Sequence, residues 1–99
     1  MDKTTALNYA SIYANEVKKI YKPDAVLLYG SYAKDTHTED SDIDIAVVFK
    51  TLNADYLTLS KGLYKLRRNI CVDIEPILLD DSDNKSGFLN EIYQTGIVL

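Results

Sequence analysis

The chain has 99 residues, of which 46% are apolar, and a formal net charge of −4. We expect one domain with one core, spanning residues 1–99, and the composition excludes a disordered chain. The acidic balance argues against general nucleic-acid binding, which needs a basic surface. No apolar run approaches the roughly 18 to 20 residues that cross a bilayer, and the N-terminus lacks the layout of a signal peptide. With its single cysteine, Cys71, the chain is expected to be cytoplasmic and free of membrane contact.

The first segment has the spacing of an amphipathic helix. Apolar or small side chains recur every three or four residues from about Thr5 to Tyr21, so one face should lie on a sheet. Asp2 or Thr4 can cap the start of this helix, and Pro23 ends it. The positions expected to face inward are Leu7, Ala10, Tyr13 or Ala14, Val17, and Ile20 or Tyr21.

Two apolar strands with a polar connection follow. The nearly all-apolar run Ala25–Tyr29 predicts a central strand that is covered on both faces. It ends at Gly30 and Ser31. The connection is expected to be a short helical turn over Ser31–Lys34 and a loop over Asp35–Ser41, before a second strand over Ile43–Phe49.

Asn53 or Asp55 can cap a second long helix. Gly62 lies inside this helix and lowers its intrinsic stability, so we expect a packing reason for it. Leu57 and Tyr64 fall beside the main apolar stripe and make the apolar surface wider than one sheet face needs. The stripe itself is formed by Tyr56, Leu59, Leu63, Leu66 and Ile70.

The same helix carries a basic face, in which Lys61, Lys65 and Arg68 recur at helical spacing. A solvated helix face explains such a stripe more simply, and an anionic partner is the alternative.

The C-terminal third predicts one more strand and one short helix. The strand is expected over Ile70–Leu79, with Pro76 at an edge, a bulge or a strand end because proline cannot donate a ladder hydrogen bond. A polar loop over Asp80–Lys85 follows, and Gly96 ends the last helix. Ser86 is its candidate cap, the residues expected to face inward are Phe88, Leu89, Ile92 and Tyr93, and the apolar tail Ile97–Leu99 should add an edge strand or pack on a partner.

The candidate site lies between the first two strands. Asp42 and Asp44 are two residues apart at the start of the second strand, so both carboxylates should point to one face. Gly30 and Ser31 end the first strand, where the backbone can approach a phosphate closely. Carboxylates and phosphates are the ligands of hard divalent ions, so this stretch is a plausible metal cradle.

A third carboxylate has two candidates, Asp73 and Glu75, on the third strand. They either converge with the aspartate pair or line the solvent face of an edge strand, and the residue pattern favours neither. Converging carboxylates would themselves imply a cation. Two other polar residues are weaker candidates: His37 is expected to be a surface histidine rather than a metal ligand, and Tyr32, beside Ser31, could contact a nucleotide.

The spacing of Gly30-Ser31, ten residues, and Asp42-Ile43-Asp44 matches the signature of the DNA polymerase β-like nucleotidyltransferase superfamily. The segments Gly-Ser-Tyr-Ala-Lys and Ser-Asp-Ile-Asp resemble its minimal members, which include the MntA-type antitoxins that pair with HEPN-domain toxins of the HepT type. The resemblance covers essentially the whole chain. It implies an α/β (α+β) fold, in which helices pack on a small mixed β-sheet.

The resemblance also implies a chemistry and roles for single residues. A nucleoside monophosphate, AMP from ATP, would be transferred to a hydroxyl with the help of two Mg²⁺ ions. Asp42 and Asp44 would hold the metal ions, and Gly30, Ser31 and Lys34 would contact the triphosphate. In the branch of minimal members with an Ile-Glu-Pro segment, the third carboxylate is the glutamate, which favours Glu75 over Asp73.

The resemblance leaves the acceptor to be supplied from elsewhere. The larger members carry a further domain that binds the acceptor, so a HEPN-type partner or a second copy of the chain would bring it here. One position departs from the family pattern, because members commonly have glycine where this chain has Asp35. The alternative to an enzyme is therefore a non-catalytic antitoxin or binding module with a degenerate nucleotide site. A dimeric enzyme that modifies a small molecule is the least favoured interpretation.

Overall fold

The computed structural model describes residues 1–52, 55–83 and 87–99. Its elements are the helices α1 (Lys3–Tyr21), α2 (Ser31–Lys34), α3 (Tyr56–Arg67) and α4 (Phe88–Thr95), the strands β1 (Ala25–Tyr29), β2 (Ile43–Phe49), β3 (Ile74–Asp80) and β4 (Ile97–Val98), and a 3₁₀ turn, η1 (Asp81–Asp83). The strands form one sheet in the order β3-β2-β1-β4. The β2–β3 pair is parallel and the other two pairs are antiparallel, so the sheet is mixed, as expected.

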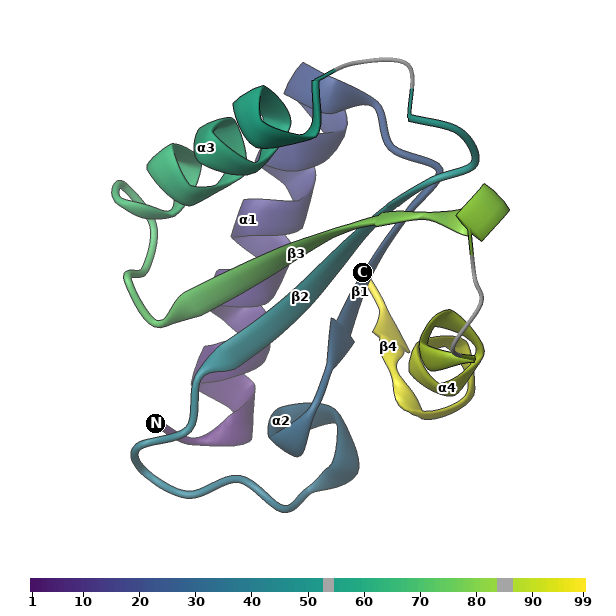
Figure 1. The fold of residues 1–99 in the computed structure, drawn as a ribbon. Coiled ribbons are helices and arrows are strands. Elements are labelled where there is room, and N and C mark those ends of the chain that lie inside the picture. The colour runs from purple at the N-terminus through teal and green to yellow at the C-terminus, as the bar shows by residue number, and fades with distance from the viewer. Residues whose placement is uncertain (53–54, 84–86) are drawn as a thin grey trace.

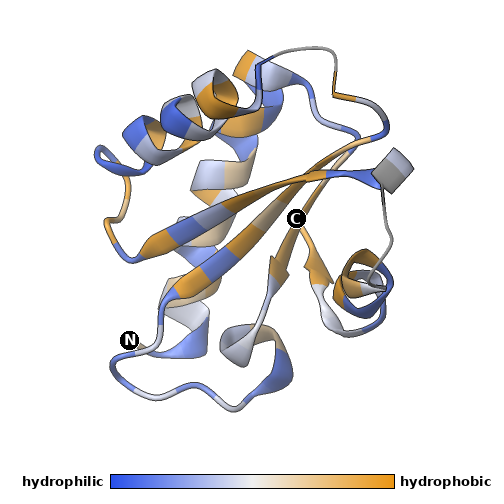
Figure 2. Ribbon diagram, viewed as in Figure 1, coloured by the Kyte–Doolittle hydropathy of each residue, from blue (hydrophilic) through white to orange (hydrophobic). Residues whose placement is uncertain are grey.

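Helices cover the sheet on two sides (Figure 1). Long α1 crosses one face with α3 beside it, whereas α4 lies on the opposite face near β4. Figure 2 shows the apolar strands between these helices, whose outer faces are largely hydrophilic. The buried side chains accordingly form two clusters, a large one that includes residues of α1, α3 and alternate strand positions, and a smaller one under α4 that includes Leu27, Ala46 and Val48.

The ends of α1 follow from local chemistry. Of the two candidate caps, Asp2 is the one used, since its carboxylate accepts a 2.8 Å hydrogen bond from the Thr5 amide and the helix begins at Lys3. Lys22 ends the helix in a left-handed conformation, with φ 51°, just before Pro23. Among the two inward candidates near the end, Tyr21 is partly buried and Ile20 is 55% exposed.

The expected third strand is four residues too long at its start. The Arg67 carbonyl accepts hydrogen bonds from the amides of Ile70 and Cys71, so the chain is still turning after α3, and β3 begins only at Ile74. Pro76 lies inside β3 opposite Ile45. β3 is an edge strand with a neighbour on one side only, so the lack of an N–H group on Pro76 is tolerated there.

Several helix positions are more exposed than their spacing predicts. Tyr56 is 50% exposed, and Phe88 and Tyr93 are 37% and 45% exposed, whereas Leu63, Leu89 and Ile92 are buried as expected. Ser86 and Asn53, two candidate caps, lie outside the described residues. Asp55 caps α3 by accepting from the Leu57 amide.

The glycine inside α3 has the packing reason that was expected. A Cβ at Gly62 would clash with the hydroxyl of Tyr21 on α1, so the absent side chain lets the two helices approach. At the C-terminus, Gly96 caps α4 through a 2.7 Å bond from its amide to the Ile92 carbonyl. The tail then forms β4 on the outer side of β1, so the edge-strand alternative is confirmed. In the described part of the chain, no helix is long and apolar enough to cross a membrane.

A buried hydroxyl joins α1 to α3. Tyr13 is fully buried and donates a 2.7 Å hydrogen bond to the Leu63 carbonyl. We expect Tyr13→Phe to lower the free energy of unfolding by about 1 to 1.5 kcal/mol, because a carbonyl loses a partner in a dry interface. Tyr9→Phe, which removes a hydroxyl from the partly buried Tyr9 of the same helix, is the control. Urea unfolding measures both, and equal losses would contradict the role of the bond.

Candidate functional site

Strand register brings three functional side chains into one row across the sheet. Asp44 of β2 lies opposite Tyr29 of β1 on one side and opposite Glu75 of β3 on the other. Side chains at paired positions point to the same face, which here is the face that carries Ala46 and α4. The row therefore lies on the side of the sheet away from α1.

Asp44, like the other two members of the row, is partly buried. Burial first, and then the negative charges of Asp42 and Glu75, raise the pKa of its carboxyl above the ordinary value of 3.8. Burial and the charge of Asp44 likewise raise the pKa of Tyr29 to about 12. The charges of two neighbouring carboxylates thus act on Asp44 at this end of the sheet.

Gly30 lies directly against the Asp44 carboxylate. A Cβ built on Gly30 would clash with Oδ2 of Asp44 and lie 3.1 Å from its Cγ. The backbone angles of Gly30, φ 75° and ψ −150°, fall in a region that is essentially limited to glycine. Gly30 therefore brings a bare backbone to the aspartate, as the close approach of a phosphate requires.

Asp42 precedes β2 and is exposed at the end of the loop. The loop is closed just before it, where the Thr38 amide donates to Ser41 Oγ at 2.8 Å and the Ser41 amide donates to the Thr38 carbonyl at 3.2 Å. The Ile43 amide then bonds to the Asp73 carbonyl. These bonds fix the start of β2 and with it the position of Asp42.

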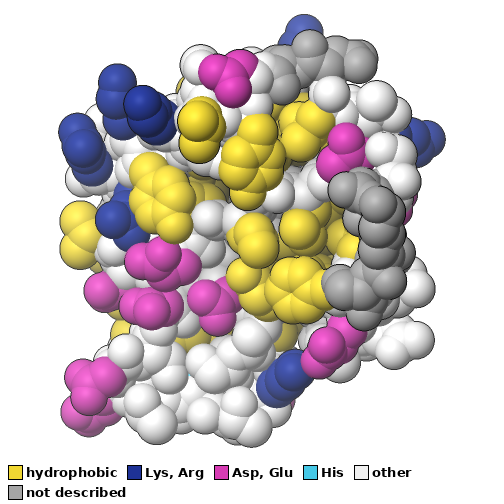
Figure 3. All heavy atoms as spheres, viewed as in Figure 1, with side chains coloured by type: hydrophobic (Ala, Val, Ile, Leu, Met, Phe, Trp, Pro, Cys, Tyr) yellow, Lys and Arg dark blue, Asp and Glu magenta, His cyan; other side chains and the backbone are white. Residues whose placement is uncertain are grey.

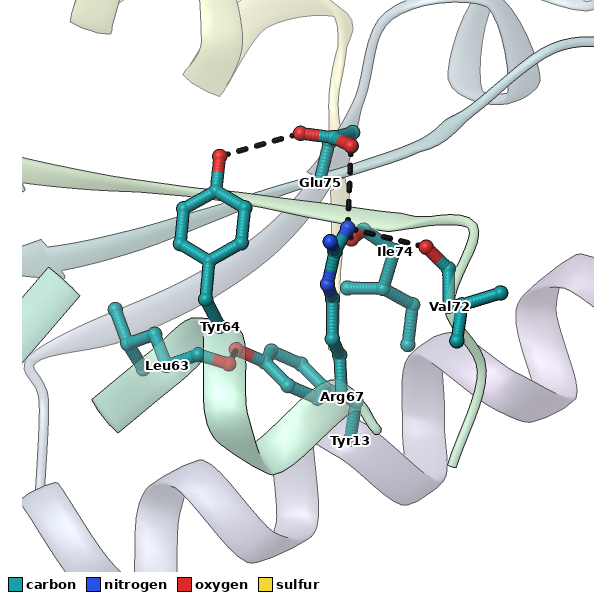
Figure 4. Close-up of polar contacts among 7 residues, drawn as sticks. All are labelled: Tyr13, Leu63, Tyr64, Arg67, Val72, Ile74 and Glu75. Atoms are coloured by element: carbon teal, nitrogen blue, oxygen red, sulfur yellow. Dashed lines mark hydrogen bonds and ion pairs between the residues drawn. The ribbon is translucent and has the colours of Figure 1, made fainter. Parts of the chain in front are cut away.

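Glu75 is held by two residues of α3, as Figure 4 shows. Its Oε1 lies 3.2 Å from Nη1 of Arg67, and its Oε2 accepts a 3.2 Å hydrogen bond from the Tyr64 hydroxyl. The same Nη1 donates to the carbonyls of Val72 and Ile74 at 3.0 and 2.8 Å. The guanidinium also lies 4.8 Å from the centre of the Tyr64 ring. Arg67 is thus tied to the backbone and provides a fixed positive charge for Glu75.

The start of β3 at Ile74 distinguishes the two candidates for the third carboxylate, because Asp73 lies before the strand and Glu75 lies within it. Asp73 is an exposed residue of the turn before the strand. Its charge acts on buried Tyr32, whereas the charges that shift the pKa of Asp44 come from Asp42 and Glu75. The geometry therefore groups Glu75, and not Asp73, with the aspartate pair.

The donor chemistry of this group fits a divalent ion. Asp42, Asp44 and Glu75 offer carboxylate oxygens, the ligands that Mg²⁺ prefers. Over residues 1–52, 55–83 and 87–99, no three acidic, histidine or cysteine side chains are already gathered as a finished metal site. Glu75 is bound instead to Tyr64 and Arg67.

A pocket of about 170 Å³ adjoins Gly30 on the α4 side. It is lined by Tyr29, Gly30, Lys34, Phe88, Glu91, Ile92 and Thr95. Lys34 reaches across it and pairs with Glu91 at 3.3 Å, and Phe88 packs edge-on against Tyr29. Sequence reasoning missed Glu91, since nothing in the spacing links α4 to the Gly30 turn. Ser31 begins α2 beside this pocket and is partly exposed.

One of the two predictions for the neighbouring aromatic residues is wrong. Tyr32 is fully buried, and its hydroxyl donates to the Met1 carbonyl at 2.9 Å, so it has no free surface for a nucleotide. His37 is partly exposed, while its ring stacks on Tyr32 with 4.4 Å between centroids and its Nδ1 is buried. Among the described residues, that nitrogen has no hydrogen-bond partner.

Asp35, the one position that departs from the family pattern, adopts a left-handed conformation with φ 59°, a region that glycine enters readily. Its carboxylate pairs with Nζ of Lys3 at 2.6 Å, and this bond holds the pKa of Asp35 below its ordinary value. Lys3 of α1 therefore neutralises the extra negative charge of Asp35. This weakens the argument that Asp35 makes the nucleotide site degenerate.

We expect Gly30→Ala to destabilise the protein by about 2 to 4 kcal/mol, since it combines backbone strain with a clash against Asp44. Gly87→Ala is a matched control, because Gly87 also has φ 75° but a Cβ there would meet nothing within 4 Å. The control should lose only about 1 to 2 kcal/mol. Equal losses in urea unfolding would show that the approach of Gly30 to Asp44 is not tight.

Asp44→Asn should stabilise the protein near neutral pH when divalent ions are removed with EDTA. Folding raises the pKa of Asp44 above its ordinary value of 3.8. Between 3.8 and the raised pKa, the folded state therefore binds more protons than the unfolded state, and the free energy of unfolding falls as the pH rises through this range. Asparagine avoids this loss. We expect a gain of up to about 1 kcal/mol at neutral pH, reduced by solvent screening, that shrinks toward about pH 4. Exposed Asp40→Asn is the control, and a gain independent of pH would contradict the prediction.

Comparisons with known proteins identify the family of the chain. The family model described as "Polymerase beta, Nucleotidyltransferase" matches residues 13–99. A "Putative protein adenylyltransferase" of Methanocaldococcus jannaschii is 43% identical over 54 residues, which are 50% of this chain and 54% of that relative. The chain thus matches about half the length of this relative.

The fold also has a counterpart among solved structures. A crystal structure of a "putative nucleotidyltransferase" from Sulfolobus solfataricus aligns with a TM-score of 0.68 and 23% identity, and the match covers 97% of this chain and 80% of that one. This likeness concerns the fold, whereas the family model includes the Gly30-Ser31 and Asp42-x-Asp44 segments. The chain belongs to the polymerase β nucleotidyltransferase family, as its signature predicted.

Proposed function

We propose that this protein transfers AMP from ATP to a hydroxyl group on a partner protein. The observation that carries the proposal is the position of Asp44, which lies opposite Glu75 in the row, has the glycine backbone of Gly30 against its carboxylate and feels the charge of Asp42. Family membership supports nucleotidyl transfer, and the name of the Methanocaldococcus jannaschii relative supports a protein as the acceptor.

In the proposed reaction the acceptor oxygen attacks the α-phosphate of ATP in line and pyrophosphate leaves. In this proposal the protein backbone at Gly30 and Ser31 would bind the triphosphate. Lys34 is the nearest cation of the pocket, and we expect it to exchange its bond to Glu91 for a phosphate. Glu75 lies on the acceptor side, where its carboxylate would orient the hydroxyl and take its proton.

Asp42, Asp44 and Glu75 are the residues that would hold two Mg²⁺ ions. When bound, the ions would neutralise the phosphates and stabilise the attacking and leaving oxygens. The chain's own contribution is to keep these carboxylates close in spite of their repulsion. Arg67 offsets the negative charge of Glu75, because its guanidinium stays beside that carboxylate through bonds to two carbonyls.

The acceptor that we propose is a HEPN-domain toxin, which the modification would inactivate, so that the chain acts as an antitoxin. This finer assignment rests on the resemblance of the Gly-Ser-Tyr-Ala-Lys and Ser-Asp-Ile-Asp segments to minimal antitoxin members. The non-catalytic module is the competing hypothesis, and the experiment below separates the two.

We expect the protein, incubated with α-labelled ATP, Mg²⁺ and its HEPN-type partner, to transfer label to the partner. Asp42→Asn should reduce the transfer on the order of 100-fold or more, because it removes an anionic oxygen that the metal ions require. Asp40→Asn, an exposed aspartate of the same loop, is the control and should transfer normally.

Two results would contradict the enzymatic proposal. Label transfer that is equal in Asp42→Asn and the parent would show that the aspartate pair does not act. Tight partner binding without ATP binding by calorimetry, and without transfer of label, would favour the non-catalytic module.

A further inference from the structure

The outward side of α3 combines apolar surface with positive charge that no described residue neutralises. We define the α3 face as the residues that line one hollow of about 380 Å³, namely Leu57, Ser60, Lys61, Tyr64, Lys65 and Arg68. Leu57 is 65% exposed and Tyr64 is 40% exposed. We infer that the α3 face binds an acidic segment of the acceptor protein, an inference that rests on the proposed function.

The charges of the α3 face are not used within the described part of the chain. No hydrogen bond or ion pair with any described residue engages the side chains of Lys61, Lys65 or Arg68. By contrast, Lys3, Lys34 and Arg67 each have an acidic partner. Three cations on α3 and its C-terminal cap that have no partner among the described residues mark a local surface of opposite sign in a chain with net charge −4. Such a surface attracts an anionic partner.

The α3 face is also joined to the site. Tyr64 belongs to both, since its ring lines the hollow and its hydroxyl donates to Glu75 at 3.2 Å. Figure 3 shows Lys and Arg side chains over the region of α3, directly above a group of Asp and Glu side chains. A segment bound on α3 would therefore end beside Glu75, the carboxylate proposed to receive the acceptor hydroxyl.

The site itself explains why the partner needs this basic surface. Asp42, Asp44 and Glu75 repel acidic chains, and a bound triphosphate would add further negative charge. The pocket at Gly30 and Lys34 lies across the row from β3, where the nucleotide is proposed to bind. The α3 face is thus the cationic approach on the Glu75 side, and its exposed Leu57 provides apolar contact. A polypeptide that carries both acidic and apolar side chains fits this combination.

The test compares two charge-reversal variants with the same net charge. The first changes Lys61, Lys65 and Arg68 to glutamate, and the second changes Lys19, Lys22 and Lys50, which are exposed cations outside the α3 face. The probe is a random glutamate–tyrosine copolymer, which supplies both negative charge and hydroxyls, and its binding is measured by fluorescence anisotropy without nucleotide. At low ionic strength we expect the first variant to bind about tenfold or more weakly, while the second changes much less.

Further measurements keep the test independent of folding and of catalysis. Circular dichroism and ATP binding should be unchanged in the first variant, and Leu57→Ser, a single change at an exposed position, should also weaken copolymer binding. If no variant transfers label but the α3 reversal still abolishes binding, the proposed function fails and the docking surface stands. If label transfer to the copolymer occurs and the α3 reversal leaves it unchanged, the function stands and this inference is overturned.

Three other outcomes would also overturn the inference. Equal losses in the two reversal variants would show that net charge alone governs binding. Tighter binding of a lysine–tyrosine copolymer, or of a single-stranded RNA oligonucleotide, would show that the partner is not an acidic polypeptide. A dimer in sedimentation equilibrium that Leu57→Ser dissociates would assign the α3 face to a second copy of the chain.

Discussion

The register of β2 against its two neighbours is the constraint on which the site depends. Asp44 faces Tyr29 and Glu75 because Ile43 and Ile45, on the other face of the strand, are fully buried in the larger core cluster. A slip of one residue would bury the aspartate and expose both isoleucines. The burial of these isoleucines therefore both stabilises the fold and orients the carboxylate of Asp44 toward the opposite face of the sheet.

The register brings like charges close together, and a neighbouring arginine offsets part of their repulsion. Asp44 is partly buried among like charges, and its raised pKa reflects the resulting strain on the ionised form. Glu75 is partly neutralised by Arg67, whose Nη1 also bonds to the carbonyls of Val72 and Ile74. One arginine therefore both fixes the turn into β3 and offsets the charge of the third carboxylate. The remaining repulsion favours a cation between the acidic groups.

The sequence predicted what depends on local pattern and missed what depends on tertiary contacts. Apolar periodicity and the Gly-Ser and Asp-x-Asp segments were sufficient for the strands, the main helices and the aspartate pair. The late start of β3 was missed because Ile70 and Cys71 look like strand residues, although the Arg67 carbonyl binds their amides. The choice between Asp73 and Glu75 depends on that start. No spacing rule could have paired Lys34 with Glu91 across 57 positions.

The order of the strands also fixes the directions from which two substrates could enter. An in-line displacement requires the attacking oxygen and the leaving group on opposite sides of the phosphorus. Gly30 and the pocket beneath α4 lie on the β1 side of Asp44, whereas Glu75 and α3 lie on the β3 side. Under the proposed function, the triphosphate and the acceptor therefore approach Asp44 from opposite edges of one row. The pairing order β3-β2-β1 thus puts the two sides that the proposed in-line displacement needs on opposite flanks of Asp44, while binding of the triphosphate would still require Lys34 to leave Glu91.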